Sequence, residues 1–275
     1  MNGTCDQPFG ADHLHVEHHG QLSIGTAPVV MVHGSWTDGT TWRMVVPDLA
    51  PDHLVVTYDR RGHSRSPWPH PVTRRQDEDD LIEIIERLGA GPVHLISSSY
   101  GGAITLTVAA RRPELVCSVT AHEPALFGVA RPGTSLGGLI DDIRRWMVSV
   151  VGRELAAGRH EAGAQRFFDE VLGAGAWEAL PAGFRAAIAA NAHTFAGMLE
   201  DPSWDQLTAS PDPSVPVMLT KGTTSPVWLT GVVDQLAASV YAHASCRTIH
   251  GAGHSPHLTH PAEFGATLRA FVTVR

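Results

Sequence analysis

A short run of small residues, ISSSYGG at Ile96–Gly102, is the feature that most restricts how this chain can fold. It follows a strand-like apolar stretch and opens an Ala-rich, helix-like stretch. A strand that turns into a helix this tightly needs small residues two positions before and after the turn, as in the G-x-S-x-G nucleophile elbow. Gly101 satisfies the second position, whereas Ser97 stands where the first glycine is usual. The run predicts that Ser99 is a nucleophile raised above a sheet at a helix N-terminus, where N–H groups favour an anion. A Ser/Gly-rich turn without chemistry is the alternative.

Apolar runs alternate with helical patterns along the rest of the chain. Continuous apolar runs rich in β-branched residues are typical of parallel strands buried on both faces. They occur at Ala27–Val32, Leu54–Tyr58, Val93–Ile96, Leu115–Thr120, Val217–Leu219 and Cys246–Ile249. Helical periodicity lies between them, at Gln76–Leu88, Tyr100–Arg112 and Pro261–Val272. This alternation predicts the α/β class, with a doubly wound, mostly parallel sheet and right-handed crossovers.

One long segment interrupts the alternation. Residues 125–214 carry little strand signal, and their apolar positions are spaced as helices around Leu139–Val150, Ala157–Leu172 and Ala182–Leu199. Several prolines between residues 202 and 216 mark the way back to the sheet. We therefore expect a helical cap at residues 125–214, inserted into a core made of residues 1–124 and 215–275.

Charge and composition exclude several classes of partner. The formal net charge of −8 argues against nucleic acid or an anionic membrane, because both attract basic surfaces. No apolar run approaches the ~20 residues of a membrane span, and the first residues do not resemble a signal peptide. Cys5, Cys117 and Cys246 show neither disulfide nor metal spacing, so we expect free thiols and a cytoplasmic protein. The His-rich segment His13–His19 is interpreted as an early strand, with a metal cluster as the less favoured alternative.

Two further motifs accompany the Ser99 turn. Val32–Trp36 reads VHGSW after a strand-like run, and Tyr58–Ser64 reads YDRRGHS after the next one. With these three motifs in order, the chain resembles the α/β-hydrolase family from about residue 15 to its C-terminus.

The resemblance assigns roles to several of these residues. It implies that VHGSW is the family's HG-x loop, and that the backbone N–H groups of Ser35 and Tyr100 form an oxyanion hole. It also implies that Asp59 and Arg61 belong to the scaffold.

A serine hydroxyl needs a neighbouring base to become a nucleophile. Seventeen histidines are present, so composition cannot identify that base. In the α/β-hydrolase family the base follows the last strand, and Ile249–His254, which reads IHGAGH, resembles that loop. The resemblance implies that His254 is the base. The competing candidates are His250, His257 and His260, and His257 is also expected to line the pocket.

The acid of the triad is where the chain departs from the family pattern. Most members carry an Asp after the strand that follows the cap, but here Lys221–Pro226 reads KGTTSP and Ser225 holds that place. Zearalenone-type lactone hydrolases carry the acid at the end of the strand before the cap, and the chain resembles them in its His-Glu pair there. Glu123 is therefore predicted as the acid, one helix and one strand after Ser99. Asp234 is the reserve candidate.

These motifs predict a serine hydrolase that cleaves a carboxylic ester or lactone through an acyl-enzyme on Ser99, with His254 and Glu123 completing the triad. We expect no metal and no organic cofactor. The expected partner is a small-molecule ester or lactone, and a homodimer is compatible with the sequence. Two alternatives stay open: a non-hydrolytic enzyme of this fold (C–C cleavage, cyclisation or acyl transfer) and a ligand-binding module with a vestigial triad. The proposed pocket walls, each with core or cap packing as the alternative, are Trp36, Trp146, Trp177 and His257, with Trp204 and Met198 as further candidates.

Overall fold

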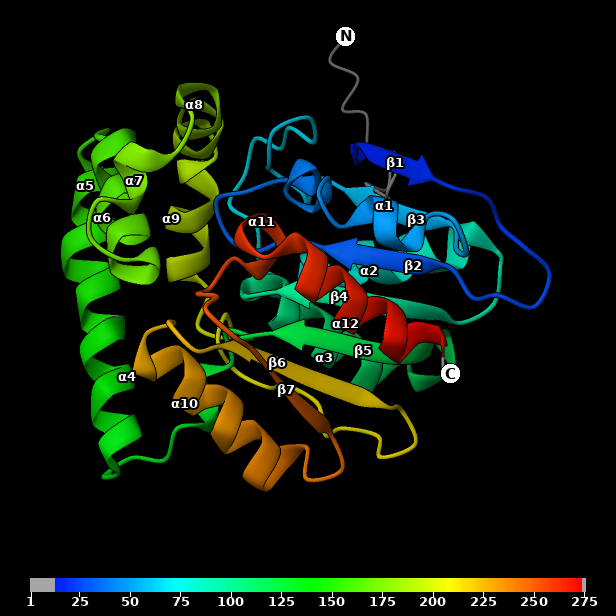
Figure 1. Ribbon diagram of the computed structural model, residues 1–275. Coiled ribbons are helices and arrows are strands. Elements are labelled where there is room, and N and C mark those ends of the chain that lie inside the picture. The colour runs from blue at the N-terminus through cyan, green and yellow to red at the C-terminus, as the bar shows by residue number, and fades with distance from the viewer. Residues whose placement is uncertain (1–12, 274–275) are drawn as a thin grey trace, which may run out of the picture.

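The computed structural model describes residues 13–273, which contain a seven-stranded sheet in the order β1-β3-β2-β4-β5-β6-β7 (Figure 1). Strand β1 runs antiparallel to β3, and every other neighbouring pair is parallel. The strands are β1 (Val16–His19), β2 (Val29–Val32), β3 (Val55–Tyr58), β4 (Val93–Ser98), β5 (Val116–His122), β6 (Val217–Gly222) and β7 (Ser245–Ile249). The predicted α/β class with a mostly parallel sheet is confirmed, and β1 lies in the His-rich segment where an early strand was expected.

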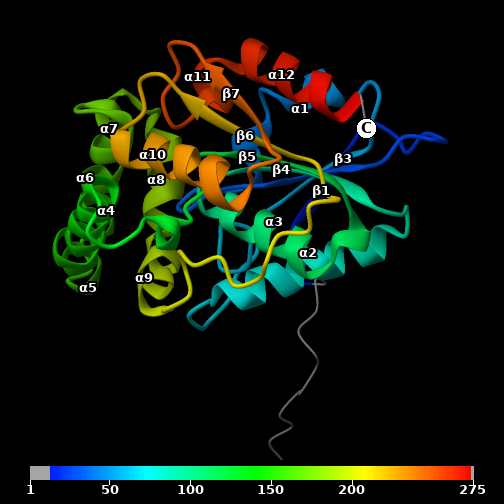
Figure 2. The same cartoon turned by 90° about the horizontal axis from the view of Figure 1, so that it is seen from below.

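Both faces of the sheet are buried, because side chains that alternate along a strand enter two different apolar clusters. In β2, Val30 and Val32 pack with helices α2 (Arg74–Leu88) and α3 (Tyr100–Arg111). Val29 and Met31 pack with helices α1 (Val46–Leu49) and α12 (Pro261–Thr273) on the other face. Figure 2 shows these two helix layers on opposite sides of the sheet. The double burial explains why the strands read as continuous apolar runs.

Helix α2 shows how local sequence sets the limits of an element. Thr73 caps its N-terminus in a capping box with Gln76, and Gly89 ends it in the left-handed conformation at φ 58°. The helix therefore begins two residues before the predicted Gln76. Its apolar face, with Leu81 and Ile85, is buried against the sheet.

Between β5 and β6 the described chain forms helices and no strand. These are α4 (Ser135–Trp146), a π-helical turn (Met147–Gly152), α5 (Arg153–Ala156), α6 (His160–Leu172), α7 (Ala176–Ala179), α8 (Ala182–Ala190) and α9 (Ala192–Glu200). Figure 1 shows them stacked beyond the end of the sheet toward which β2 and β5 point. Their helical character agrees with the sequence, while the division into a cap at residues 125–214 and a separate core stays a prediction.

The stretch Ala182–Leu199 is helical as predicted, but it is divided in two. The chain breaks between α8 and α9 at Asn191. The Asn191 amide donates to the backbone oxygen of Trp36 at 2.9 Å and accepts from the N–H of Ser64 at 2.8 Å. These bonds reach residues more than a hundred positions earlier, so helical periodicity could not reveal them.

The remaining elements are α10 (Val227–Gln235), a π-helical turn (Leu236–Val240), α11 (Pro256–Thr259) and short 3-10 turns at Gly39–Trp42, Pro113–Leu115 and Phe127–Val129. Cys117 and Cys246 carry free thiols, whereas Cys5 and the segment judged for a signal peptide lie outside the described residues. Among residues 13–273, no helix combines the length and apolar character that crossing a bilayer requires.

Candidate active site

Ser99 occupies a strained turn between β4 and α3. Its backbone has φ 55° and ψ −123°, a combination that non-glycine residues rarely adopt. The turn is held from both sides, because the Ser99 N–H donates to the His122 oxygen at 2.9 Å and the Ser99 oxygen accepts from the N–H of Ala125 at 3.0 Å. Strain of this kind persists where the surrounding structure over-determines it, often at functional sites. The elbow conformation predicted from the sequence is present.

The two flanking positions of the elbow meet the space limits in different ways. A Cβ on Gly101 would lie 2.4 Å from the Val32 oxygen and 2.6 Å from the His33 oxygen, so only glycine fits there. Ser97, at the other position, is fully buried, and its hydroxyl bonds the Thr105 hydroxyl at 2.7 Å and the Thr120 oxygen. The departure from glycine is therefore compensated by hydrogen bonds.

Glu123 and His254 form the shortest polar contact of the site. Glu123 directly follows β5, and its Oε2 accepts from His254 Nδ1 at 2.6 Å. Its Oε1 accepts from the Gly222 N–H, at the end of the neighbouring strand β6, at 2.8 Å. The backbone of Glu123 has φ 42°, another strained value. The ends of the adjacent parallel strands β5 and β6 thus hold the Glu123 carboxylate beside the loop that follows β7 and carries His254.

The Glu123 carboxyl is ionised in this environment. Burial raises its pKa, but neighbouring imidazole charge and the hydrogen bond from His254 outweigh burial and lower the pKa to about 2. Burial lowers the pKa of His122 to about 4, so this neighbour is neutral at pH 7, and its charge lowers the pKa of Glu123 only because it is present in the acidic range where Glu123 itself titrates. Because His254 donates from Nδ1 to a carboxylate, its Nε2 keeps a lone pair that can accept a proton.

The reserve acid lies elsewhere. The Asp234 carboxylate, on α10, is exposed and pairs with the Lys221 ammonium. The Ser225 hydroxyl, at the place where the family usually carries Asp, is buried and uncharged. Of the acids considered from sequence, Glu123 is the one that contacts His254.

The HG loop lies against the elbow. A Cβ on Gly34 would lie 3.1 Å from the Ser99 Cβ and 3.7 Å from its Oγ, so this loop packs closely against the Ser99 side chain. Tyr100 is the first residue of α3, and its N–H therefore has no acceptor within the helix. Ser35 lines the same cavity as Ser99, and Tyr100 follows Ser99 directly in the chain, while the oxyanion hole itself stays a prediction.

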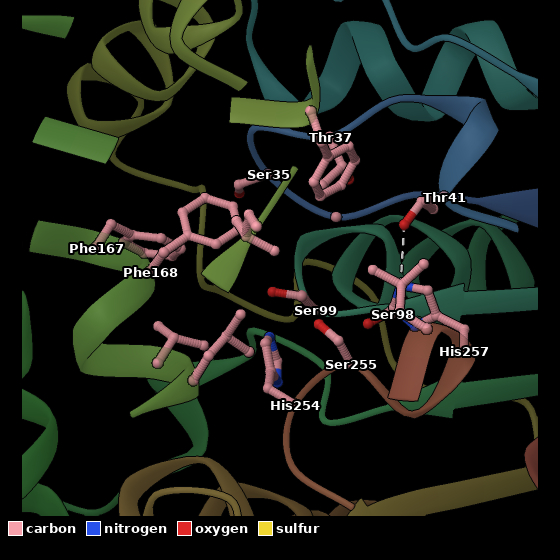
Figure 3. Close-up of a pocket in the computed structure, with 16 residues that line it drawn as sticks. Ser35, Thr37, Thr41, Ser98, Ser99, Phe167, Phe168, His254, Ser255 and His257 are labelled. Carbon is pink, nitrogen blue, oxygen red and sulfur yellow. Dashed lines mark hydrogen bonds between the residues drawn. The ribbon is translucent and has the colours of Figure 1, made fainter. Parts of the chain in front are cut away.

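One cavity joins these groups. Its volume is about 60 Å³, and Ser99, His254, Ser35 and His257 all line it. Figure 3 shows Ser99 and His254 between the Phe167–Phe168 pair and the His257 imidazole, which bonds the Thr41 hydroxyl at 3.0 Å. The apolar wall comes from the helical segment, through Phe167, Phe168, Val171, Leu172, Leu180 and Phe184. The cavity is therefore apolar on the side of α6 and α8 and polar on the side of the sheet.

The predicted aromatic walls need correction. Trp36 is fully buried and stacks on Phe195 at 4.6 Å, and Trp177 packs on Phe168 behind the cavity. Trp146 lines a separate groove. None of the three lines the cavity that holds Ser99, and neither do Trp204 and Met198. The sequence did not single out Phe167, Phe168 or Phe184, because adjacent aromatics in an amphipathic helix are equally typical of core packing.

Within the described residues, the only group of three metal-ligating side chains with ligand atoms inside 4.8 Å is His122, Glu123 and His254. Two ligand atoms of one zinc ion each lie about 2.0–2.2 Å from the metal, in tetrahedral directions, and are therefore farther from each other than from the ion. The contact of 2.6 Å between Glu123 and His254 is too short for such a pair. The geometry therefore favours a hydrogen bond between His254 and Glu123 over a metal ion bound by both.

Buried titratable groups around the site predict how stability depends on pH. Burial lowers the pKa of His33 and His257 to about 3, of His94 and His122 to about 4, and of His63 well below its ordinary value. Burial also raises the pKa of Asp77 to about 7 and raises those of Glu78 and Asp80, which opposes part of the effect.

Where the pKa of a histidine is lowered in the folded protein, the unfolded chain binds more protons than the folded protein below about pH 6.5. The contribution of such a histidine to the free energy of unfolding is complete above that pH. It is lost as the pH falls toward the pKa of the histidine in the folded protein. Each histidine whose effect is not offset by a carboxyl group lowers the free energy of unfolding by up to about 1.4 kcal/mol for every pH unit of acidification. We therefore expect the Tm to fall between pH 7 and pH 5 in thermal unfolding. A Tm that stays constant or rises over this interval would contradict the prediction.

Comparisons with known proteins agree with this architecture. The family model described as the alpha/beta hydrolase family matches residues 29–267. Lipase LipV of Mycobacterium tuberculosis is 33% identical over 128 residues, which cover 46% of this chain and 47% of that protein. The matched region spans about half or less of the length of the first curated relatives.

Solved structures match over nearly the whole chain. The enol-lactonase from Burkholderia xenovorans LB400 superposes with a TM-score of 0.71 at 21% identity, covering 94% of this chain and 96% of that one. A thermophilic esterase from Thermogutta terrifontis gives a TM-score of 0.70 at 20% identity, covering 94% and 93%. At such identities these likenesses show a shared fold. Because the family model covers most of its residues, the chain belongs to the alpha/beta hydrolase family.

Proposed function

We propose that this protein is a serine hydrolase that cleaves a carboxylic ester or lactone with Ser99 as nucleophile, His254 as base and Glu123 as acid. The observation that carries the proposal is the 2.6 Å bond from His254 Nδ1 to Glu123, made at the wall of the cavity that Ser99 also lines. A carboxylate that fixes the imidazole tautomer beside an elbow serine is the arrangement that acyl transfer requires.

The chemistry follows from these groups. His254 Nε2 takes the Ser99 proton as Oγ attacks the carbonyl carbon, and the N–H groups of Ser35 and Tyr100 hold the resulting oxyanion. The tetrahedral intermediate collapses, and His254 gives its proton to the leaving alkoxide. Water then gives a proton to His254 and attacks the acyl-enzyme, which releases the carboxylic acid and restores Ser99. Throughout, the Glu123 carboxylate stabilises the imidazolium that forms twice in each cycle.

The cavity limits the substrate. A cavity of about 60 Å³ with phenylalanines and leucines along one side suits a short or compact apolar group near the carbonyl. The names of similar proteins (lipase, esterase, enol-lactonase) are compatible with ester or lactone cleavage, although none of them identifies the substrate here. The resemblance to zearalenone-type lactonases, a cytoplasmic location and a homodimer stay predictions.

Labelling with a fluorophosphonate probe tests the nucleophile. Wild-type protein should incorporate one probe at Ser99, and the Ser99→Ala variant should incorporate none. Ser98→Ala is the matched control, because Ser98 also lines the cavity but lies at the end of β4 rather than in the elbow. We expect Ser98→Ala to retain labelling.

A panel of p-nitrophenyl esters and small lactones then tests the reaction, with the highest kcat/KM expected for short acyl groups. Wild-type protein that resists the probe would contradict the proposal and favour a binding module. Labelling without turnover of any ester or lactone would instead favour a non-hydrolytic reaction.

A further inference from the structure

A buried guanidinium contacts the peptide group that carries one of the proposed oxyanion donors. Arg60 follows β3 and is 3% exposed. Its Nη1 donates to the Asp77 carboxylate on α2 at 2.7 Å, and its backbone N–H donates to His33 Nε2 at 2.9 Å. Burying this charge is costly without a partner, and Asp77 supplies one. The ion pair therefore fixes where the rest of the guanidinium points.

The other arm of Arg60 reaches the HG loop. Its Nη2 donates to the Gly34 carbonyl oxygen at 3.1 Å, and His33 Nδ1 donates to the same oxygen at 2.8 Å. The Gly34 carbonyl and the Ser35 N–H belong to one peptide group. Two donors on the oxygen prevent that peptide from rotating. They also draw electron density toward the oxygen, which makes the N–H a stronger donor.

Arg60 also contacts the side chain of Tyr100, the residue whose backbone N–H is the second proposed donor. Its guanidinium lies over the Tyr100 ring, 4.9 Å from the ring centroid. The Ser35 and Tyr100 N–H groups come from different parts of the chain, and one cationic side chain touches both segments. An oxyanion hole acts through donors that are oriented before charge develops.

We propose that Arg60 is a positioning residue for the reaction, which orients and polarises the Gly34–Ser35 peptide so that the Ser35 N–H faces the developing oxyanion. This inference rests on the proposed function of Ser99. It concerns the transition state, because the Ser35 N–H meets its full charge only when the tetrahedral oxyanion forms.

The neighbouring arginine provides a matched control. Arg61 is also buried and also pairs with an aspartate of α2, with its Nε donating to Asp80 at 2.9 Å. Its guanidinium lies over the Trp68 ring at 4.3 Å rather than over Tyr100. Arg60 and Arg61 therefore make similar buried ion pairs. What separates them is that the second arm of Arg60 bonds the Gly34 oxygen and His63 Nε2, at 3.2 Å, and that its guanidinium lies over Tyr100.

The experiment compares Arg60→Gln with Arg61→Gln, using a short p-nitrophenyl ester and a trifluoromethyl ketone, which adds Ser99 Oγ to form a tetrahedral anion. Removing an oxyanion donor outright costs roughly 10²–10³ in rate, so loss of its positioning should lower kcat by roughly 10- to 100-fold. We expect KM to stay within about threefold and the affinity for the ketone to fall in parallel with kcat. Arg61→Gln should lower the Tm but keep kcat and ketone affinity near the wild-type values.

Equal losses of kcat and of ketone affinity in the two variants would overturn the proposal. If Arg60→Gln does not fold, Arg60→Lys and Arg61→Lys give the same comparison. Asp77 and the Gly34 oxygen are bound by two different nitrogens of Arg60, and lysine offers a single ammonium that does not reproduce this fork, so kcat should fall only in the Arg60 variant. Fluorophosphonate labelling of wild-type protein separates the two possible failures: without labelling the proposed function fails, whereas with labelling and equal variants only the role of Arg60 fails.

Discussion

Replacing Glu123 with glutamine is expected to lower kcat on an activated ester by about 10⁴-fold, the loss seen when the triad aspartate of serine proteases becomes asparagine. Glutamine preserves the shape of the side chain but carries no charge to stabilise the imidazolium. It can also donate from its amide to Nδ1, which favours the tautomer that places the hydrogen on Nε2. In that tautomer His254 cannot take the Ser99 proton. Steady-state kinetics with circular dichroism to verify folding would measure the effect.

Asp234→Asn is the matched control for this loss. Its carboxylate is exposed and pairs with Lys221 on the outside of the sheet, so kcat should remain within about twofold of wild type. Near-full turnover by Glu123→Gln would remove Glu123 from the triad. A large loss of kcat with Asp234→Asn would instead identify Asp234, on α10 after β6, as the acid of the triad.

Adding a single methyl group at Gly101 is expected to lower the free energy of unfolding by about 3 kcal/mol and to remove most of the activity. The new Cβ would lie 2.4 Å from the Val32 oxygen and 2.6 Å from the His33 oxygen, both of them backbone atoms that no rotamer change can move. Either the elbow or the HG loop must shift, and that loop leads directly into Gly34 and Ser35. For a chain of this size the stability loss corresponds to a Tm lower by roughly 6–12 °C.

The control for that variant is Gly138→Ala. Gly138 lies within α4, and a Cβ there would meet no heavy atom within 4 Å. Alanine is preferred over glycine in a helix interior by about 1 kcal/mol, so the Tm should stay the same or rise slightly with unchanged kcat. A Gly101→Ala protein with wild-type Tm and kcat would contradict the prediction, because it would show that the elbow can accommodate a Cβ at this position.

Most of the sheet could be predicted because its signals are local. A strand buried on both faces is a continuous apolar run, and Val29–Val32 and Val55–Tyr58 follow that rule closely. The helix boundaries at Thr73 and Gly89 likewise depend on neighbouring residues. The break at Asn191 and the aromatic wall of the cavity were not predictable, because both depend on contacts between segments far apart in the chain.

The tryptophans show the same limit. Trp36 and Trp177 were candidate pocket walls because large aromatic side chains often line clefts. In the structure they pack behind Phe167 and Phe168, which face the cavity instead. Which aromatic of a cluster meets the solvent is decided by how helices pack, and residue type carries little information about it.

The sequence by itself determined the α/β class, the elbow around Ser99 and the absence of an acid between Lys221 and Pro226, since each depends on residues adjacent in the chain. Only the tertiary structure decided which carboxylate meets His254. Glu123 and Gly222 stand at the ends of neighbouring parallel strands, and the loop after β7 brings the imidazole to the same edge of the sheet. Three segments must converge there, and no pattern within one of them encodes the 2.6 Å contact that results.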